Sequence, residues 1–261
     1  MPANNLFKQW LAEPTPRWGS WLMSAAPSTA ESLGYAGFDF LVVDMEHVPV
    51  ETPEVIHILR ALAATPAQPV VRLVWNDPVI VKKALDIGAQ TLMFPFIENA
   101  QEAELAVRAT RYPPAGTRGV AAVHRASHYG NDSTYLASAN DHIATIIQIE
   151  SLAGIANLEE IAAVDGVDAL FIGPGDLAAS LGYIGQIASP VVQDALKALV
   201  VRSHKAGKPC GCVAPTPQMA LQFKEYGFDF VAISSDLGFM LRQAKESLDV
   251  VRTPSKQVHG E

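Results

Sequence analysis

Two carboxylates in this sequence each follow a short apolar segment that is typical of a β-strand. Glu150 follows the segment 145–149, and Asp176 comes shortly after the segment 169–172. Because neighbouring strands lie about 4.8 Å apart, acids at the ends of two adjacent strands can share one divalent cation. We expect Glu150 and Asp176 to bind a metal, leaving open coordination positions for water and substrate. This oxygen-ligand set favours Mg²⁺ or Mn²⁺, and Co²⁺ or Zn²⁺ are also compatible with it.

Two further polar side chains, Arg72 and Gln148, occur within apolar segments. Arg72 lies in the segment 70–74, and a guanidinium there can bind a carboxylate or stabilise an enolate oxygen. Side chains alternate along a strand, so Gln148 is expected on the same face as Glu150. The alternative is an ion pair between Arg72 and Glu150, which would make Glu150 a structural residue.

His47 is the candidate general base. It follows the apolar segment 38–43 and lies three residues after Asp44. Histidine titrates near neutral pH, and a carboxylate paired with it can fix the tautomer of the imidazole. The other histidines lack such a context and are expected to be exposed or structural: His57, His142, His204 and His259.

The elements that must position these residues are eight apolar, β-branched segments separated by helix signals. The segments are 18–23, 38–43, 70–74, 91–94, 145–149, 169–172, 208–213 and 228–233. Helix-starting residues lie between them, namely Ser28 with Glu31, Thr52-Pro53, Asp77-Pro78, Asn99 with Glu102, Asn157 with Glu160, and Thr216-Pro217. Glycines that suit a left-handed helix end come just before four strands, at Gly37, Gly88, Gly207 and Gly227.

This order predicts an α/β protein, a single (β/α)₈ barrel domain over 1–261. Active sites of such barrels lie at the carboxyl ends of the strands, where the polar residues above are expected. One segment, 111–140, is far longer than an ordinary connection between a helix and a strand. We expect this excursion to cover a site or a neighbouring subunit, and to end in a short helix near 135–143.

Composition narrows the function classes. The chain carries 19 basic and 27 acidic residues, a formal net charge of −8, without a dense basic run, which argues against nucleic acid as a partner. No apolar stretch is long enough to span a membrane, and the N-terminus lacks a signal-peptide pattern, so a cytoplasmic location is expected. Cys210 and Cys212 are expected to be small core residues. The sequence motifs of serine hydrolases, P-loop proteins and dinucleotide-binding proteins are missing.

In combination, several motifs of the chain resemble the HpcH/HpaI aldolases over about residues 19 to 240. They are Asp44-Met45-Glu46-His47, Val71-Arg72, Arg111-Tyr112-Pro113-Pro114, Gln148-Ile149-Glu150 and Gly173-Pro174-Gly175-Asp176. The resemblance implies a barrel with an extra N-terminal helix and a C-terminal helix, which in this family often assembles as a hexamer built as a trimer of dimers. It also implies a class II, metal-dependent pyruvate aldolase that acts on small keto acids and aldehydes, as in aromatic compound catabolism.

The same resemblance implies roles for individual residues. Glu150 and Asp176 would hold the divalent ion, and Arg72 would contact the keto or enolate oxygen of the substrate. Gln148 would lie beside the metal site and the Gly175 amide would bind the substrate carboxylate. His47, paired with Asp44, would move the proton of the C4 hydroxyl, and Trp21 would line the pocket wall.

Several functions stay open from the sequence. The expected reaction cleaves or forms a 4-hydroxy-2-oxo acid from a pyruvate or hydroxypyruvate enolate and an aldehyde such as succinic semialdehyde. Alternatives are a 2-dehydro-3-deoxy sugar acid aldolase, a metal-dependent oxaloacetate decarboxylase and a keto-acid-binding barrel without catalysis. A Schiff-base aldolase would need a desolvated lysine at the end of a strand, and we find no lysine so placed.

Overall fold

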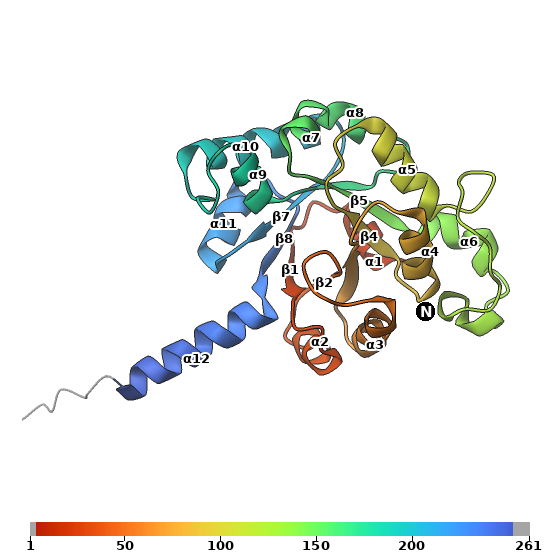
Figure 1. The fold of residues 1–261 in the computed structure, drawn as a ribbon, viewed down its shortest axis with the longest axis horizontal. Helices are drawn as coiled ribbons and strands as arrows, with labels where there is room; N and C mark the ends of the chain where they lie inside the picture. Colours follow the sequence, from red (N-terminus) through yellow and green to blue (C-terminus); the bar gives the residue numbers. More distant parts are fainter. Residues whose placement is uncertain (1–3, 253–261) are drawn as a thin grey trace, which may run out of the picture.

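The fold is a closed barrel of eight parallel strands in sequence order, surrounded by helices (Figure 1). The computed structural model describes residues 4–252. The strands are β1 (Arg17–Leu22), β2 (Phe40–Asp44), β3 (Gln68–Arg72), β4 (Thr91–Phe94), β5 (Ala144–Ile149), β6 (Ala169–Ile172), β7 (Cys210–Ala214) and β8 (Phe230–Ser235). Every strand predicted from the sequence overlaps one of these, so the predicted (β/α)₈ barrel is confirmed.

The helices alternate with the strands as the sequence predicts. They are α1 (Leu6–Trp10), α2 (Pro27–Gly34), α3 (Thr52–Leu62), α4 (Pro78–Asp86), α5 (Ala100–Thr110), the 3₁₀ segment η1 (Arg125–Gly130), α6 (Tyr135–His142), α7 (Leu152–Ala156), α8 (Leu158–Ala162), α9 (Pro174–Ser180), α10 (Pro190–Lys205), α11 (Pro217–Tyr226) and α12 (Asp236–Arg252). The four glycines predicted to end helices all have a left-handed backbone, with φ between 76° and 104°. Since these glycines sit just before strands, they set where each strand begins.

The predicted helix starts are partly right. Asp77, Asn99 and Thr216 each accept backbone N–H bonds as N-caps. The predicted capping box at Ser28 is wrong, because α2 begins at Pro27 and Ala26 takes the N-cap position, two residues before Ser28, without a side-chain bond. Helix α3 is likewise capped one residue before the predicted Thr52, by Glu51.

Two apolar layers hold the barrel together. One fills the space between strands and helices, and the other fills the barrel itself. In the inner layer Phe7 from α1 packs edge-on against Phe40 and Phe230, with ring centroids 5.5 and 5.4 Å apart. The N-terminal helix therefore plugs the amino end of the barrel and leaves the carboxyl end for the site.

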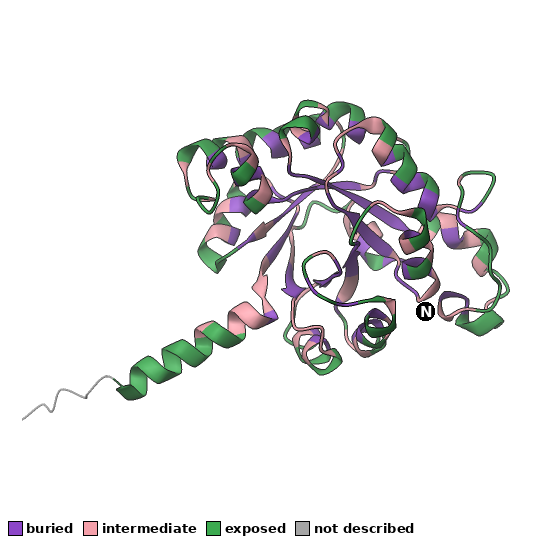
Figure 2. Cartoon of the chain, viewed as in Figure 1, coloured by how far each residue is buried: buried purple, intermediate pink, exposed green. Residues whose placement is uncertain are grey.

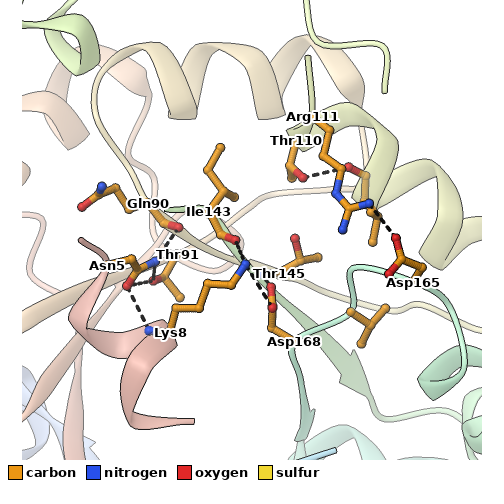
Figure 3. A network of polar contacts seen from close by, with 12 residues as sticks. Asn5, Lys8, Gln90, Thr91, Thr110, Arg111, Ile143, Thr145, Asp165 and Asp168 are labelled. Carbon is orange, nitrogen blue, oxygen red and sulfur yellow. Dashed lines mark hydrogen bonds and ion pairs between the residues drawn. The ribbon is translucent and has the colours of Figure 1, made fainter. Parts of the chain in front are cut away.

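Polar contacts tie this plug to the barrel (Figure 3). Asn5 donates to the carbonyl of Gln90 at 2.9 Å, just before β4. Lys8 donates to the carbonyl of Ile143 at 2.7 Å and forms an ion pair with Asp168 at 3.3 Å. These bonds fix α1 across the starts of three consecutive strands, β4 to β6.

The excursion 111–140 lies at the amino end of the barrel, the end opposite the expected site. Arg118 donates to Asp86 at 2.8 Å, and Arg125 donates to the carbonyl of Ile87 at 2.7 Å, both near the end of α4. Its last part forms α6, close to the predicted helix. This position keeps the excursion away from the site of its own barrel, and a role in covering a neighbouring subunit stays a prediction.

The last helix, α12, extends away from the barrel (Figure 1) and is exposed along most of its length (Figure 2). Large apolar side chains on it face solvent, namely Met240, Leu241, Leu248, Val250 and Val251. Over residues 4–252, no helix combines the length and the apolar character needed to cross a bilayer. Cys210 and Cys212 are fully buried core residues, as predicted, and burial raises the pKa of both thiols.

Candidate active site

The predicted polar residues gather at the carboxyl ends of the strands. Asp44 ends β2 and Arg72 ends β3, and the two are direct neighbours in the strand register. Glu150 follows β5, and Asp176 lies in the first turn of α9, which follows β6. This placement results from parallel pairing, because the carboxyl ends of all strands meet at one rim of the barrel.

Arg72 is held by two acids. Its Nε donates to Asp44 Oδ1 at 2.9 Å and its Nη2 to Asp44 Oδ2 at 2.7 Å, while its Nη1 pairs with Glu46 Oε2 at 2.7 Å. The guanidinium carbon also lies 4.3 Å from the centroid of the Trp21 ring. Asp44 is fully buried, so this two-point pair fixes the guanidinium rigidly. One hydrogen on each Nη is left for a ligand.

The expected side-chain pair between Asp44 and His47 does not form. Asp44 uses both oxygens on Arg72, and His47 reaches it only through a backbone N–H at 3.5 Å. The His47 side chain is 59% exposed, and its Nε2 lies 4.0 Å from Glu46 Oε1. Glu46 is therefore the acid beside the imidazole, and sequence reasoning left it without a role. Strand alternation could have indicated a role for Glu46, because side chains two residues apart along a strand, here 44 and 46, share a face.

Glu150 is buried, with 1% of its surface exposed. Its Oε1 accepts from the backbone N–H of Phe96 at 3.0 Å and its Oε2 from Gln148 Nε2 at 2.6 Å. Among residues 4–252 no lysine, arginine or histidine nitrogen lies within 4.0 Å of it, so the alternative ion pair with Arg72 does not form. Burial, reinforced by the negative charges of Asp176 and Glu46, raises the pKa of Glu150 to about 7.

Two backbone features around Glu150 escaped the sequence reasoning. Phe96, whose N–H binds the carboxylate, has a positive φ of 50°, which is uncommon for a bulky residue. Gly173 leaves space on the other side, because a Cβ there would lie 2.2 Å from Glu150 Oε2. Glycine is thus required at position 173 by the carboxylate and not by its backbone angles, which are ordinary.

The residues present fit a divalent cation. Among the described residues Glu150 has no ion-pair partner and Gln148 Oε1 is buried without a hydrogen-bond partner, and Asp176 is close enough to raise the pKa of Glu150. A buried carboxylate and a buried amide oxygen without partners both cost free energy that a cation would recover. Within the described chain no group of three or more His, Cys, Asp or Glu side chains is arranged around one point. An ion held here by Glu150 and Asp176 would keep open positions for water or substrate.

Comparisons with known proteins agree with the geometry of this candidate site. The HpcH/HpaI aldolase/citrate lyase family model matches residues 17–243. A 2-dehydro-3,6-dideoxy-6-sulfogluconate aldolase of Pseudomonas putida is 54% identical over 88% of this chain and 90% of its own. A 5-keto-4-deoxy-D-glucarate aldolase of Salmonella newport (strain SL254) is 44% identical over 95% of this chain and 97% of its own.

A solved structure leads to the same family. The crystal structure of an HpcH/HpaI aldolase/citrate lyase family protein from Burkholderia cenocepacia J2315 superimposes with a TM-score of 0.93 at 43% identity, covering 96% of this chain and 100% of that one. The family match spans the whole barrel, including every residue discussed at the strand ends. The chain therefore belongs to the HpcH/HpaI aldolase/citrate lyase family and is a carbon-carbon lyase, an aldolase that depends on a divalent metal.

Proposed function

We propose that this enzyme cleaves a six-carbon 2-dehydro-3-deoxy sugar acid, with an anionic group at its far end, into pyruvate and a three-carbon aldehyde. The relatives named above favour this alternative over a reaction with succinic semialdehyde. Both of their substrate names describe a ketone next to a carboxylate and a second acidic group at the other end of the chain. The observation that carries the proposal is the buried Glu150 without a cationic partner, beside Asp176 and the unpartnered oxygen of Gln148.

Glu150 and Asp176 would hold Mg²⁺ or Mn²⁺, with Gln148 beside the ion. When bound, such an ion supplies a Lewis acid for the ketone and carboxylate oxygens of the substrate. The amide of Gly175 would bind the substrate carboxylate. Position 175 is exposed, and even a Cβ there would meet nothing within 4 Å, so the backbone is open to a ligand.

In the cleavage direction His47 would remove the proton from the C4 hydroxyl. The C3–C4 bond then breaks and the aldehyde leaves, while the electron pair of that bond passes to C3 and the former ketone oxygen as an enolate. A proton returned to C3, through His47 or solvent, then gives pyruvate. Arg72, with one free hydrogen on each Nη, would stabilise the negative charge that develops on that oxygen. Since Asp44 is occupied by Arg72, we assign Asp44 the role of positioning the guanidinium, and Glu46 the role of orienting His47.

We also propose that the chains associate into an oligomer. The family resemblance implies a hexamer. The apolar side chains exposed on α12 support this, because contiguous exposed apolar surface commonly marks an interface. The excursion 111–140 exposes Val120 and Val123 at the amino end of the barrel. Light scattering coupled to gel filtration tests the assembly, and a monomeric mass would contradict it.

The direct test is pyruvate release from a panel of synthetic 4-hydroxy-2-oxo acids, with EDTA or with added Mg²⁺ or Mn²⁺. We expect metal-dependent release that is faster from the sugar acids than from the succinic semialdehyde adduct. Glu150→Gln should abolish the metal response, whereas Glu225→Gln, which removes the same charge from an exposed position, should not. Release that survives EDTA, with borohydride trapping of pyruvate on a lysine, would refute the metal-dependent mechanism. Release from oxaloacetate alone would favour decarboxylation.

A further inference from the structure

A cavity of about 300 Å³ opens beside the site, at the carboxyl ends of β1, β7 and β8. Its walls include Trp21, Pro174, Val213, Ser234 and Ser235. Two of these residues adjoin the site. The Arg72 guanidinium lies over the Trp21 ring, and Pro174 directly precedes Gly175 and Asp176 in the sequence. A substrate held at the metal centre can therefore extend into this cavity.

The cavity wall contains a buried donor without a partner. Trp21 is only 6% exposed, yet its Nε1 makes no hydrogen bond to any described residue. An indole N–H can only donate, so the missing partner must be an acceptor. Buried polar groups without partners are rare in folded proteins, and this one belongs to a residue of the cavity wall.

Two hydroxyls at the end of β8, the strand paired with β1, also line the cavity. Ser234 has a φ of 52°, a left-handed conformation that costs free energy for a residue other than glycine. Its Oγ accepts from Arg242 Nη2 at 3.1 Å, and Ser235 Oγ accepts from the N–H of Gly238 at 3.1 Å. Because both oxygens act as acceptors here, the hydrogen of each hydroxyl is free to be donated to a ligand.

One cationic side chain, Arg242, contacts one of these hydroxyls. Among residues 4–252 no carboxylate oxygen lies within 4.0 Å of the Arg242 guanidinium, which rests near the Phe239 ring at 5.6 Å. The nearest acid in sequence, Asp236, has both oxygens occupied by the backbone N–H groups of Met23, Ser24 and Leu237. Two hydroxyls thus line the cavity, and one of them is hydrogen-bonded to a guanidinium that has no ion-pair partner among the described residues.

We infer that Trp21, Ser234, Ser235 and Arg242 form the subsite for the terminal oxyanion of the sugar acid, a carboxylate or a sulfonate. This inference rests on the proposed function and specifies the far end of its substrate. Several hydrogen-bond donors and a guanidinium suit an oxygen-rich anion, since bonds to a charged acceptor are the strong ones. The same groups would leave a neutral hydroxymethyl end without comparable stabilisation.

The test uses three substrates with one 2-dehydro-3-deoxyhexonate skeleton, ending in a hydroxymethyl, a carboxylate or a sulfomethyl group. We expect wild-type kcat/KM to favour at least one anionic end. Ser234→Gly removes a hydroxyl at a position whose backbone suits glycine, and Arg242→Gln removes the charge. Each should lower the preference for the anionic end by roughly 10- to 100-fold, mainly through KM, with the neutral substrate unchanged.

Lys245→Gln is the matched control, because it removes one positive charge from the exposed part of the same helix. It should leave all three kcat/KM values unchanged. Comparing the carboxylate with the sulfonate shows which oxyanion the subsite accepts. The subsite would be overturned if both Ser234→Gly and Arg242→Gln kept the wild-type preference for the anionic end, or if they lost activity equally on all three substrates. Metal-dependent cleavage of these substrates would still support the proposed function. Failure of the wild type to release pyruvate from any of the three would refute both.

Discussion

Gly173→Ala should disable the metal centre without unfolding the barrel. The new Cβ would lie 2.2 Å from Glu150 Oε2 and 3.0 Å from Gln148 Nε2. Ordinary contact begins at 3.4 Å, so the carboxylate must move by about 1.2 Å. The backbone at Gly173, with φ of −84°, accepts alanine without strain. The largest displacement should therefore fall on Glu150, and a smaller one on Gln148.

A shift of this size is large for a metal ligand. Misplacing a reacting group by about 1 Å typically costs on the order of 100-fold in rate. We expect Mg²⁺ and Mn²⁺ affinity to fall by roughly 10- to 100-fold, with a similar or larger loss in kcat/KM. Isothermal titration with Mn²⁺ and the pyruvate-release assay measure the two quantities, and circular dichroism checks the fold.

Gly175→Ala is the control, because its Cβ meets nothing within 4 Å and the backbone amide is kept. It should bind metal like the wild type. Wild-type Mn²⁺ affinity in Gly173→Ala, with the protein folded, would refute the role of Glu150 as a ligand held in place by the glycine. Equal losses in both variants would show that the loop, and not the carboxylate, is sensitive.

Three further predictions concern buried charges and thiols. Asp44→Asn leaves the buried Arg72 with a single acid and should lower the free energy of unfolding by about 3 kcal/mol in urea titrations; an unchanged midpoint would contradict this. Because the folded-state pKa of Glu150 is raised from 4.5 to about 7, the metal-free protein should lose roughly 3 kcal/mol of stability as pH rises between those values. Urea midpoints at about pH 5 and pH 8 in EDTA test this, and the Glu150→Gln variant should lack the drop. Cys210 and Cys212 should stay unreactive toward a thiol reagent in the native protein and react on denaturation, because burial raises the pKa of both thiols; rapid native labelling would count against it.

Local chemistry in the sequence was sufficient to predict the barrel. Apolar segments of strand length, proline and asparagine at helix starts, and glycine at helix ends each act over a few residues, and their alternation implies one parallel sheet. The errors in the predicted helix starts were also small shifts along the chain. Pro27 shifted the start of α2 by two residues, since proline suits the first helical turn whatever side chain follows it.

Sequence reasoning named candidate residues for the site but not which of them contact one another. The sequence alone placed Asp44 and Glu150 directly after strand segments and Arg72 within one, and the structure ends β3 at Arg72. Only the tertiary structure decided that Asp44 binds Arg72 and not His47, since partners are chosen by the register between neighbouring strands and not by separation along the chain. The same holds for Gly173 and Phe96, which reach Glu150 from other loops of the barrel, and such contacts between distant segments leave no periodic pattern in the sequence.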